Sequence, residues 1–186
     1  MTTAFRDSAR FALRDRTAAC HARIDAAFGK LDLTAPAGLA TFLAANHAVL
    51  SVLEPILHGA PELPALPPRL GALEEDLAAL GHPIPRPARV DLSGHDRLGI
   101  AYVVGGSALG GRVLERRRAA SADPAVRGAG RFMDDPRMMP YWASVQGRLR
   151  TIMPGEERFD GLVKAAEATF GAFGSALREV GRDVHD

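Results

Sequence analysis

The chain has 186 residues, of which 47% are hydrophobic and 24% charged, and this composition is typical of a soluble globular protein. Its length predicts a single domain spanning residues 1–186. The formal net charge of +1 gives no reason to expect binding to nucleic acid or another polyanion. The single cysteine, Cys20, excludes an intrachain disulfide and favours a reducing cytoplasm. No apolar run reaches the roughly 18 residues of a membrane span, and the charged first residues do not resemble a secretory signal.

The first half of the chain has the periodicity of amphipathic helices. Apolar residues step by three or four from Leu13 to Leu31, which predicts a first helix that Ser8 is placed to cap. Pro36 marks the start of a second helix, and Pro55 should kink or end it. A turn follows at 61–68. Then come a short helix at 70–80, closed by Gly81, and a proline-rich loop at 82–91.

The second half continues the helical pattern, so the predicted fold class is all-α. Residues 119–135 read as irregular with a short helix near Val126, and 140–153 and 156–180 read as two further helices. The β-branched run Ile100–Val104 has the local propensity of a strand. We predict that it is helical, because a strand without partners is not stable.

Five glycines fall within the 13 residues from Gly99 to Gly111, and each weakens a helix by about 0.8–1 kcal/mol relative to alanine. Close packing of another helix, or close approach of a flat apolar ligand, would compensate for this loss; a flexible loop is the third alternative. Nucleotide binding is excluded on spacing. Arg112 and Val113 stand where a P-loop needs Lys and then Ser or Thr, and no three glycines have the dinucleotide spacing.

His21 lies on the apolar face of the first predicted helix, where a histidine is ordinarily a core residue with satisfied hydrogen bonds. Two neighbours favour a metal ligand instead. Asp25, at position i+4, can accept the second ring N–H, as metal-bound histidines generally require. Arg14, two turns earlier on the same face, can reach a carboxylate. Cys20 points about 100° away from His21 and is interpreted as a small core residue.

These segments together resemble the haem oxygenase family, and most of all the bacterial, biliverdin-producing members often found with bacteriophytochromes. The first-helix motif of that family is matched by Leu13, Arg14, Thr17, His21 and Asp25. Its distal-helix motif is matched by Tyr102, Gly106, Ser107, Leu109, Gly110 and Gly111, and the pair Thr169-Phe170 with Phe173 matches its C-terminal pattern. The resemblance covers nearly the whole chain.

The resemblance implies a multi-helix bundle that holds haem b between a proximal and a distal helix. It implies oxidative ring opening of haem to biliverdin, carbon monoxide and ferrous iron, with O2 and an external reductant such as a ferredoxin or a flavoprotein reductase. A bacteriophytochrome is an expected acceptor of biliverdin. His21 would bind the iron, and Ser107, Gly106 and Gly110 would form the catalytic distal surface. The implied haem-binding residues are Arg14, Thr17, Tyr102, Gly106, Gly110 and Gly111.

The chain departs from its relatives at two positions. Many relatives carry Glu where this chain has Asp25, and bacterial relatives often carry Glu where it has Gly105. These departures leave open a non-catalytic haem carrier or sensor on the same fold. A haem-free interaction module and a thiaminase-like enzyme are further alternatives.

Overall fold

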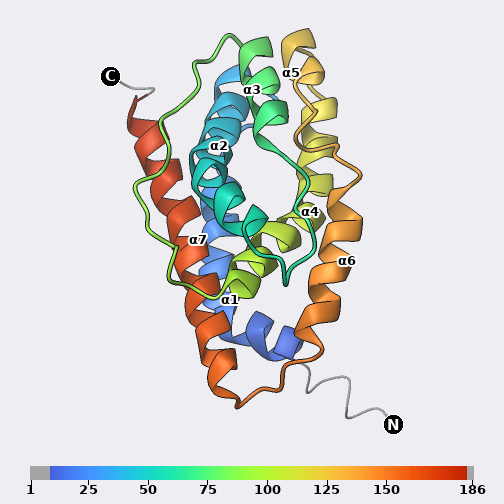
Figure 1. The fold of residues 1–186 in the computed structure, drawn as a ribbon. Helices are drawn as coiled ribbons and strands as arrows, with labels where there is room; N and C mark the ends of the chain where they lie inside the picture. Colours follow the sequence, from blue (N-terminus) through green and yellow to red (C-terminus); the bar gives the residue numbers. More distant parts are fainter. Residues whose placement is uncertain (1–8, 184–186) are drawn as a thin grey trace.

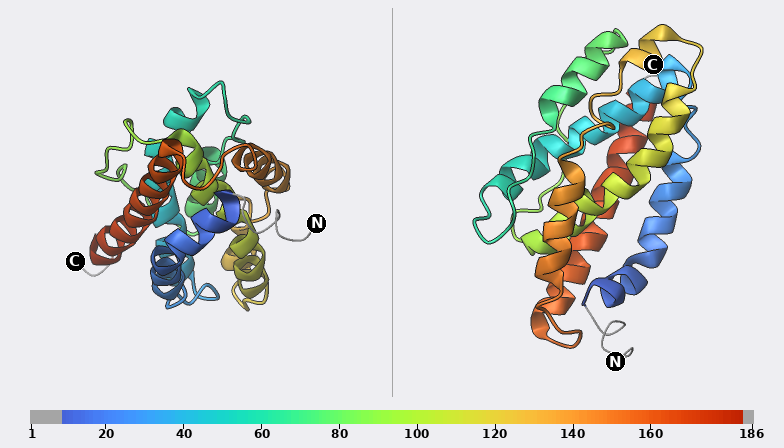
Figure 2. Two further views of the ribbon diagram at one scale, coloured as in Figure 1. Left: turned by 90° about the horizontal axis from the view of Figure 1, so that it is seen from below. Right: turned by 90° about the vertical axis from the view of Figure 1, so that its right-hand side faces the viewer.

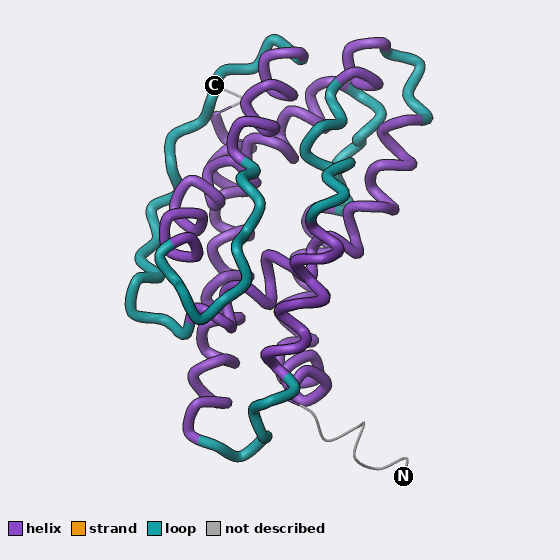
Figure 3. The backbone as a smooth tube through the Cα atoms, turned by 45° about the vertical axis from the view of Figure 1, so that its right-hand side comes forward, coloured by secondary structure: helices purple, strands orange, loops and turns teal. Residues whose placement is uncertain are grey.

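The computed structural model describes residues 9–183, and this part of the chain folds into seven helices with no strand (Figures 1 and 3). The prediction of an all-α class is therefore confirmed. The helices are α1 (Ala9–Phe28), α2 (Pro36–His58), α3 (Leu70–Ala79), α4 (Arg97–Ala119), α5 (Pro124–Gly128), α6 (Met138–Leu149) and α7 (Glu157–Asp183).

The long helices form an elongated bundle in which α1, α4 and α7 run in one general direction and α2 and α6 run in the other (Figures 1 and 2). Helix α7 packs against α1, α2 and α4, and α4 also packs against α6. The short helices α3 and α5 lie together at one end, where α2 begins (Figure 1). This arrangement leaves α1 and α4 on either side of a space that α2, α6 and α7 close off.

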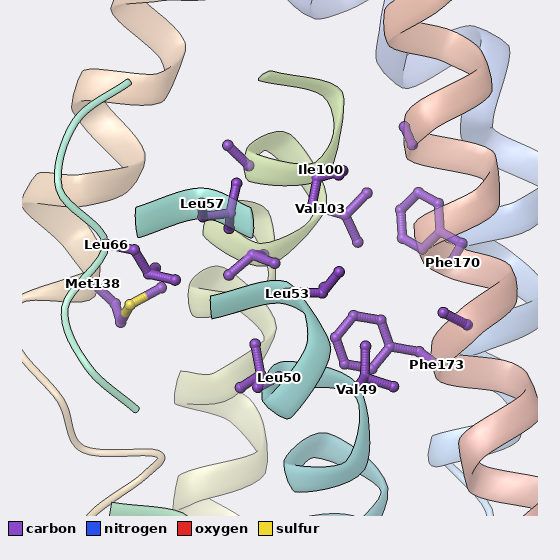
Figure 4. Packing of buried hydrophobic residues seen from close by; sticks show 14 of the residues in the cluster. Val49, Leu50, Leu53, Leu57, Leu66, Ile100, Val103, Met138, Phe170 and Phe173 are labelled. Carbon is purple, nitrogen blue, oxygen red and sulfur yellow. The ribbon is translucent and has the colours of Figure 1, made fainter. Parts of the chain in front are cut away.

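The core is built around α2, because this helix is apolar on nearly every side and most of its residues are buried. Figure 4 shows side chains of α2 packed between α4 and α7. The labelled residues include Val49, Leu50, Leu53 and Leu57 of α2, Ile100 and Val103 of α4, and Phe170 and Phe173 of α7. Among the described helices, only α2 is long and apolar enough to cross a membrane by length and composition, and 61% of that window is buried inside the bundle. Buried core helices of soluble proteins pass the same test, so this finding assigns no membrane span.

Most predicted elements are present, with boundaries that differ by a few residues. Ile100–Val104 lies inside α4, as predicted, and Asp96 caps this helix by accepting a hydrogen bond from the Leu98 amide at 2.9 Å. Gly81 follows α3 with a φ of 67°, a left-handed conformation that glycine adopts without strain. Pro55 does not end α2, which continues to His58; the proline lies in the last turn, where few hydrogen bonds remain to be lost. The predicted cap, Ser8, lies outside the described residues.

Candidate functional site

A cavity of about 1010 Å³ lies between α1 and α4. Helices α2, α6 and α7 contribute to its walls, together with Arg69 and the segment 132–136. Cofactor sites typically measure roughly 300–1,000 Å³ and combine apolar walls with a few placed polar groups. This cavity is at the upper end of that range, so it has room for a ligand as large as a tetrapyrrole.

The α1 wall presents His21 to the cavity. Leu13 and Thr17 turn inward and are buried, whereas the side chain of His21 is 60% exposed and its ring lies 5.5 Å from that of Phe170. The ordinary expectation for a histidine on an apolar helix face, a satisfied core residue, is therefore wrong for this chain. Asp25 Oδ2 lies 3.6 Å from His21 Nε2, near the imidazole but just beyond direct hydrogen-bond distance.

The α4 wall includes three glycines among its lining residues, and the five glycines of this helix region divide into two groups. Gly99 and Gly105 are packing positions. A Cβ at Gly99 would lie 2.6 Å from the Leu162 carbonyl oxygen of α7, and one at Gly105 would lie 3.0 Å from the Trp142 ring of α6. A Cβ at Gly99 would therefore clash with the α7 backbone, and one at Gly105 would be tightly packed against α6; neither glycine lines the cavity.

The second group, Gly106, Gly110 and Gly111, lines the cavity. Among the described residues, a Cβ at Gly110 or Gly111 would meet no atom of a neighbouring element within 4 Å, and one at Gly106 would meet Trp142 at 3.8 Å. Packing against a neighbouring helix therefore accounts for two of the five glycines. The remaining three leave open space above the backbone, which is the property that a flat ligand requires.

The beginning of α1 brings two arginines to the cavity. Arg10 and Arg14 both line it, and in the described part of the chain neither has a carboxylate within 4 Å. With its amide oriented to satisfy both groups, Gln146 accepts hydrogen bonds through its side-chain oxygen from Trp142 Nε1 at 2.9 Å and from Arg10 Nε and Nη2 at 3.2 Å. These two cations are therefore available to a carboxylate on a bound ligand.

Tyr102 and Thr17 connect α4 to α1 beside these arginines. Thr17 Oγ1 donates to the Leu13 carbonyl at 2.8 Å and is also hydrogen-bonded to Tyr102, whose ring lies 5.8 Å from that of Trp142. Burial raises the pKa of Tyr102, against the opposing effects of Thr17 and of the Arg14 charge, so the phenol is protonated at neutral pH. Thr17 is 1% exposed and does not line the cavity, so this predicted haem-binding residue lies behind Tyr102 and not at the cavity surface.

The inner wall of the cavity, which we define as Phe42, Asn46, Arg69 and Phe132, joins segments far apart in the sequence. The Arg69 guanidinium stacks over the Phe132 ring at 4.1 Å and donates from Nη2 to the Phe132 carbonyl at 2.7 Å. The Phe132 ring lies 6.3 Å from that of Phe42. Sequence reasoning did not identify this wall, because contacts between positions 63 residues apart leave no trace in local periodicity.

Two buried carboxylates hold the inner wall in place. Glu54 accepts a hydrogen bond from the Arg69 amide at 2.6 Å, and Asp76 accepts from the Arg131 and Phe132 amides at 3.1 and 2.9 Å. Burial raises the pKa of Asp76, and the two backbone hydrogen bonds oppose that rise. These carboxylates fix the backbone on either side of the Arg69–Phe132 contact.

The other acids at the cavity are paired with arginines outside its lining. Arg118, which is 4% exposed, lies 3.0 Å from Glu115 and 3.5 Å from Asp134. Arg137 forms two hydrogen bonds of 2.8 Å with Asp135. Among the described residues, these pairs leave Arg10, Arg14 and Arg116, besides Arg69, as lining arginines without an ion-pair partner.

The residues left out of the predicted site have structural or surface positions. Cys20 is half-buried and accepts a hydrogen bond from Arg23 at 3.1 Å. His47 is buried against Glu74 at 3.3 Å, and His58 is within 3.0 Å of the Leu66 carbonyl oxygen. Within residues 9–183, no group of three or more His, Cys, Asp or Glu side chains is placed to bind a metal ion.

Seven of the eight predicted site residues line this one cavity. They are Arg14, His21, Tyr102, Gly106, Ser107, Gly110 and Gly111. The Ser107 hydroxyl donates to the Val104 carbonyl at 2.7 Å, which leaves its oxygen able to accept a hydrogen bond from a water or ligand.

Comparison with known proteins identifies no relative: no protein-family model matches the chain, and a search of curated proteins finds no significant match.

Proposed function

We propose that this chain is a haem oxygenase, which opens haem b oxidatively to biliverdin, carbon monoxide and ferrous iron using O2 and an external reductant. One observation carries the proposal. A cavity of about 1010 Å³ has an exposed histidine in one wall and a surface of glycine backbone in another. An axial ligand and a surface without side chains are the two features that a porphyrin between helices needs.

The residues around the cavity fit haem in three respects. His21 offers a ring nitrogen to the iron, and Asp25 at 3.6 Å is near enough to orient the imidazole directly or through one water. Gly110 and Gly111 leave more than 4 Å of open space where side chains would stand. Arg10 and Arg14 supply guanidinium groups for the two propionates, since arginine binds carboxylates in a planar, two-pronged geometry.

Haem, when bound, would supply both the iron that activates O2 and the ring that is oxidised. The protein contributes position and exclusion. The α4 backbone at Gly106, Gly110 and Gly111 would lie against the bound ring and would restrict which edge is open to reaction. The Ser107 oxygen would be able to accept a hydrogen bond from a water there, and Tyr102 connects α4 to α1 through Thr17.

Haem titration of the purified chain tests the binding half of this proposal. The wild type should form a 1:1 complex with a sharp Soret band. His21→Ala should lose the spectrum of histidine-ligated iron, and Gly171→Ala, a change on α7 outside the cavity lining, should keep it. Unchanged iron ligation in His21→Ala would remove His21 as the axial ligand.

Turnover of the complex tests the catalytic half. Addition of ascorbate, or of a ferredoxin with its reductase, should bleach the Soret band and produce the absorption of biliverdin. If the haem band persists in the wild type under both reductants, the chain is a haem carrier or sensor and not an oxygenase. If no complex forms at all, both the oxygenase and the haem-carrier hypotheses fail, and the chain is a haem-free helical module.

A further inference from the structure

Arg69 is the most deeply buried cation in the cavity lining. The residue is 5% exposed, and burial lowers the pKa of its guanidinium to about 10, against the opposing effects of the Asp135 and Glu54 charges. It therefore remains protonated at neutral pH. Burying such a charge costs free energy unless hydrogen bonds or an opposite charge compensate for the lost water.

The described residues satisfy this guanidinium only in part. Nη2 donates to the Phe132 carbonyl, but Nε is buried without an acceptor. In the part of the chain that the structure describes, no carboxylate lies within 4 Å of the guanidinium. Asp135 is committed to Arg137, and Glu54 is committed to the backbone amide of Arg69 itself. Donors of an arginine therefore stay open in the wall of a large cavity.

The surroundings of Arg69 indicate what would complete it. One face of the guanidinium is covered by the Phe132 ring, so a partner must approach in the guanidinium plane. Asn46, on the same inner wall, donates its side-chain amide to the Phe42 carbonyl at 2.8 Å, so Arg69 supplies the charge there. Planar groups with two oxygens match the arginine fork, and a single negative charge is the most that one buried cation balances.

We propose that Arg69 forms an inner oxyanion site in this cavity, which binds a planar group with one negative charge, such as a carboxylate. The site is distinct from the arginine pair at the beginning of α1, because Arg69 belongs to the loop before α3 and packs on Phe132. Its occupant is either a small free oxyanion, such as formate or bicarbonate, or a carboxylate carried by a larger ligand of the cavity. The proposal does not depend on haem oxygenase activity.

The test uses the haem-free wild-type chain and sodium formate as the probe, with sodium chloride keeping the ionic strength constant. Formate at ten times its Kd should raise Tm by about 3–6 °C in a saturable manner. The ¹⁵N–¹H signal of Arg69 Nε should shift with the same Kd. In Arg69→Met the formate-dependent rise should vanish, whereas Arg148→Met, which removes an exposed charge outside the cavity lining, should keep it.

If Arg69→Met does not fold, the same test can be made with Arg69→Lys. Lysine keeps the charge but lacks the planar fork, so formate should bind it about tenfold more weakly than it binds the wild type. An equal formate response in the wild type and in either Arg69 variant, or no shift of the Nε signal in the wild type, would overturn the proposal.

A second arm identifies the source of the carboxylate. If the haem-loaded protein still responds to formate, the natural occupant is a free oxyanion. If haem abolishes the response and Arg69→Met weakens haem binding, the carboxylate belongs to the tetrapyrrole. Both results support the site, and they differ only in what fills it.

Discussion

Replacing Gly110 with alanine should make the protein more stable and bind haem less well. Gly110 lies in the interior of α4, and a Cβ there would meet no other atom within 4 Å. The methyl group therefore causes no clash in the ligand-free chain. Alanine favours a helix over glycine by about 0.8–1 kcal/mol, which in a chain of this length raises Tm by about 2–4 °C.

The same methyl group would occupy space that a flat ligand needs, because Gly110 lines the cavity. Overpacking a close-fitting surface costs about 1–3 kcal/mol, or about 5- to 150-fold in Kd. Gly171→Ala is the matched control. Gly171 lies inside α7, has no atom within 4 Å of its ideal Cβ position, and does not line the cavity.

The assay combines thermal unfolding of the haem-free proteins with haem titration followed at the Soret band. Both alanine variants should gain stability, and only Gly110→Ala should lose haem affinity. If Gly110→Ala binds haem as tightly as Gly171→Ala, the glycine wall is not the surface against which the ligand lies. If Gly110→Ala is instead destabilised, the open space above this residue does not exist in solution.

Three further predictions follow from the packing and the buried groups. Gly99→Ala should lower the free energy of unfolding by about 1–3 kcal/mol in thermal melts, because its Cβ would lie 2.6 Å from the Leu162 carbonyl; a neutral result would contradict the close α4–α7 contact. Tyr102→Phe removes the hydrogen bond to Thr17, so its free energy of unfolding in urea should fall by about 0.5–1.5 kcal/mol. Thr17→Val and the double variant should show the same decrease, which would confirm that the two side chains interact. Burial raises the pKa of Asp76, so folding favours its protonated form, and the contribution of this residue to stability is lost as pH rises through that raised pKa. Asp76→Asn removes this dependence, so its destabilisation should be larger at about pH 3.5 than at about pH 7; a constant difference would show that the pKa of Asp76 is not raised.

The helical fold was predictable because its information is local. The three-to-four spacing of apolar residues located the long helices, and the absence of partner strands correctly overrode the strand propensity of Ile100–Val104. Helix ends were less certain because they depend on tertiary contacts. Pro55 lacks an amide hydrogen, yet α2 continues to His58, where Leu57 is buried in the core.

The candidate site was predictable only where it follows one helix. His21 and Asp25 are one turn apart on α1, and Gly106 and Gly110 are one turn apart on α4, so spacing places each pair on one face. The inner wall depends on Asp76 binding the amide of Phe132, 56 residues away. No pattern within a single helix carries that information, and for the same reason the sequence did not indicate Arg69 as a cavity residue.

The role of each glycine in α4 also depends on which helix lies beside it. Members of the haem oxygenase family, which the sequence resembles, often carry Glu where this chain has Gly105, and glycine by itself weakens a helix. The structure favours the opposite effect, because Tyr141 and Trp142 of α6 lie against Gly105, where a Cβ would be 3.0 Å from the Trp142 ring. Trp142 also lines the cavity and shares Gln146 with Arg10. The missing side chain at Gly105 therefore lets α6 approach α4, and that approach brings Trp142 and the Arg10 contact to the edge of the cavity.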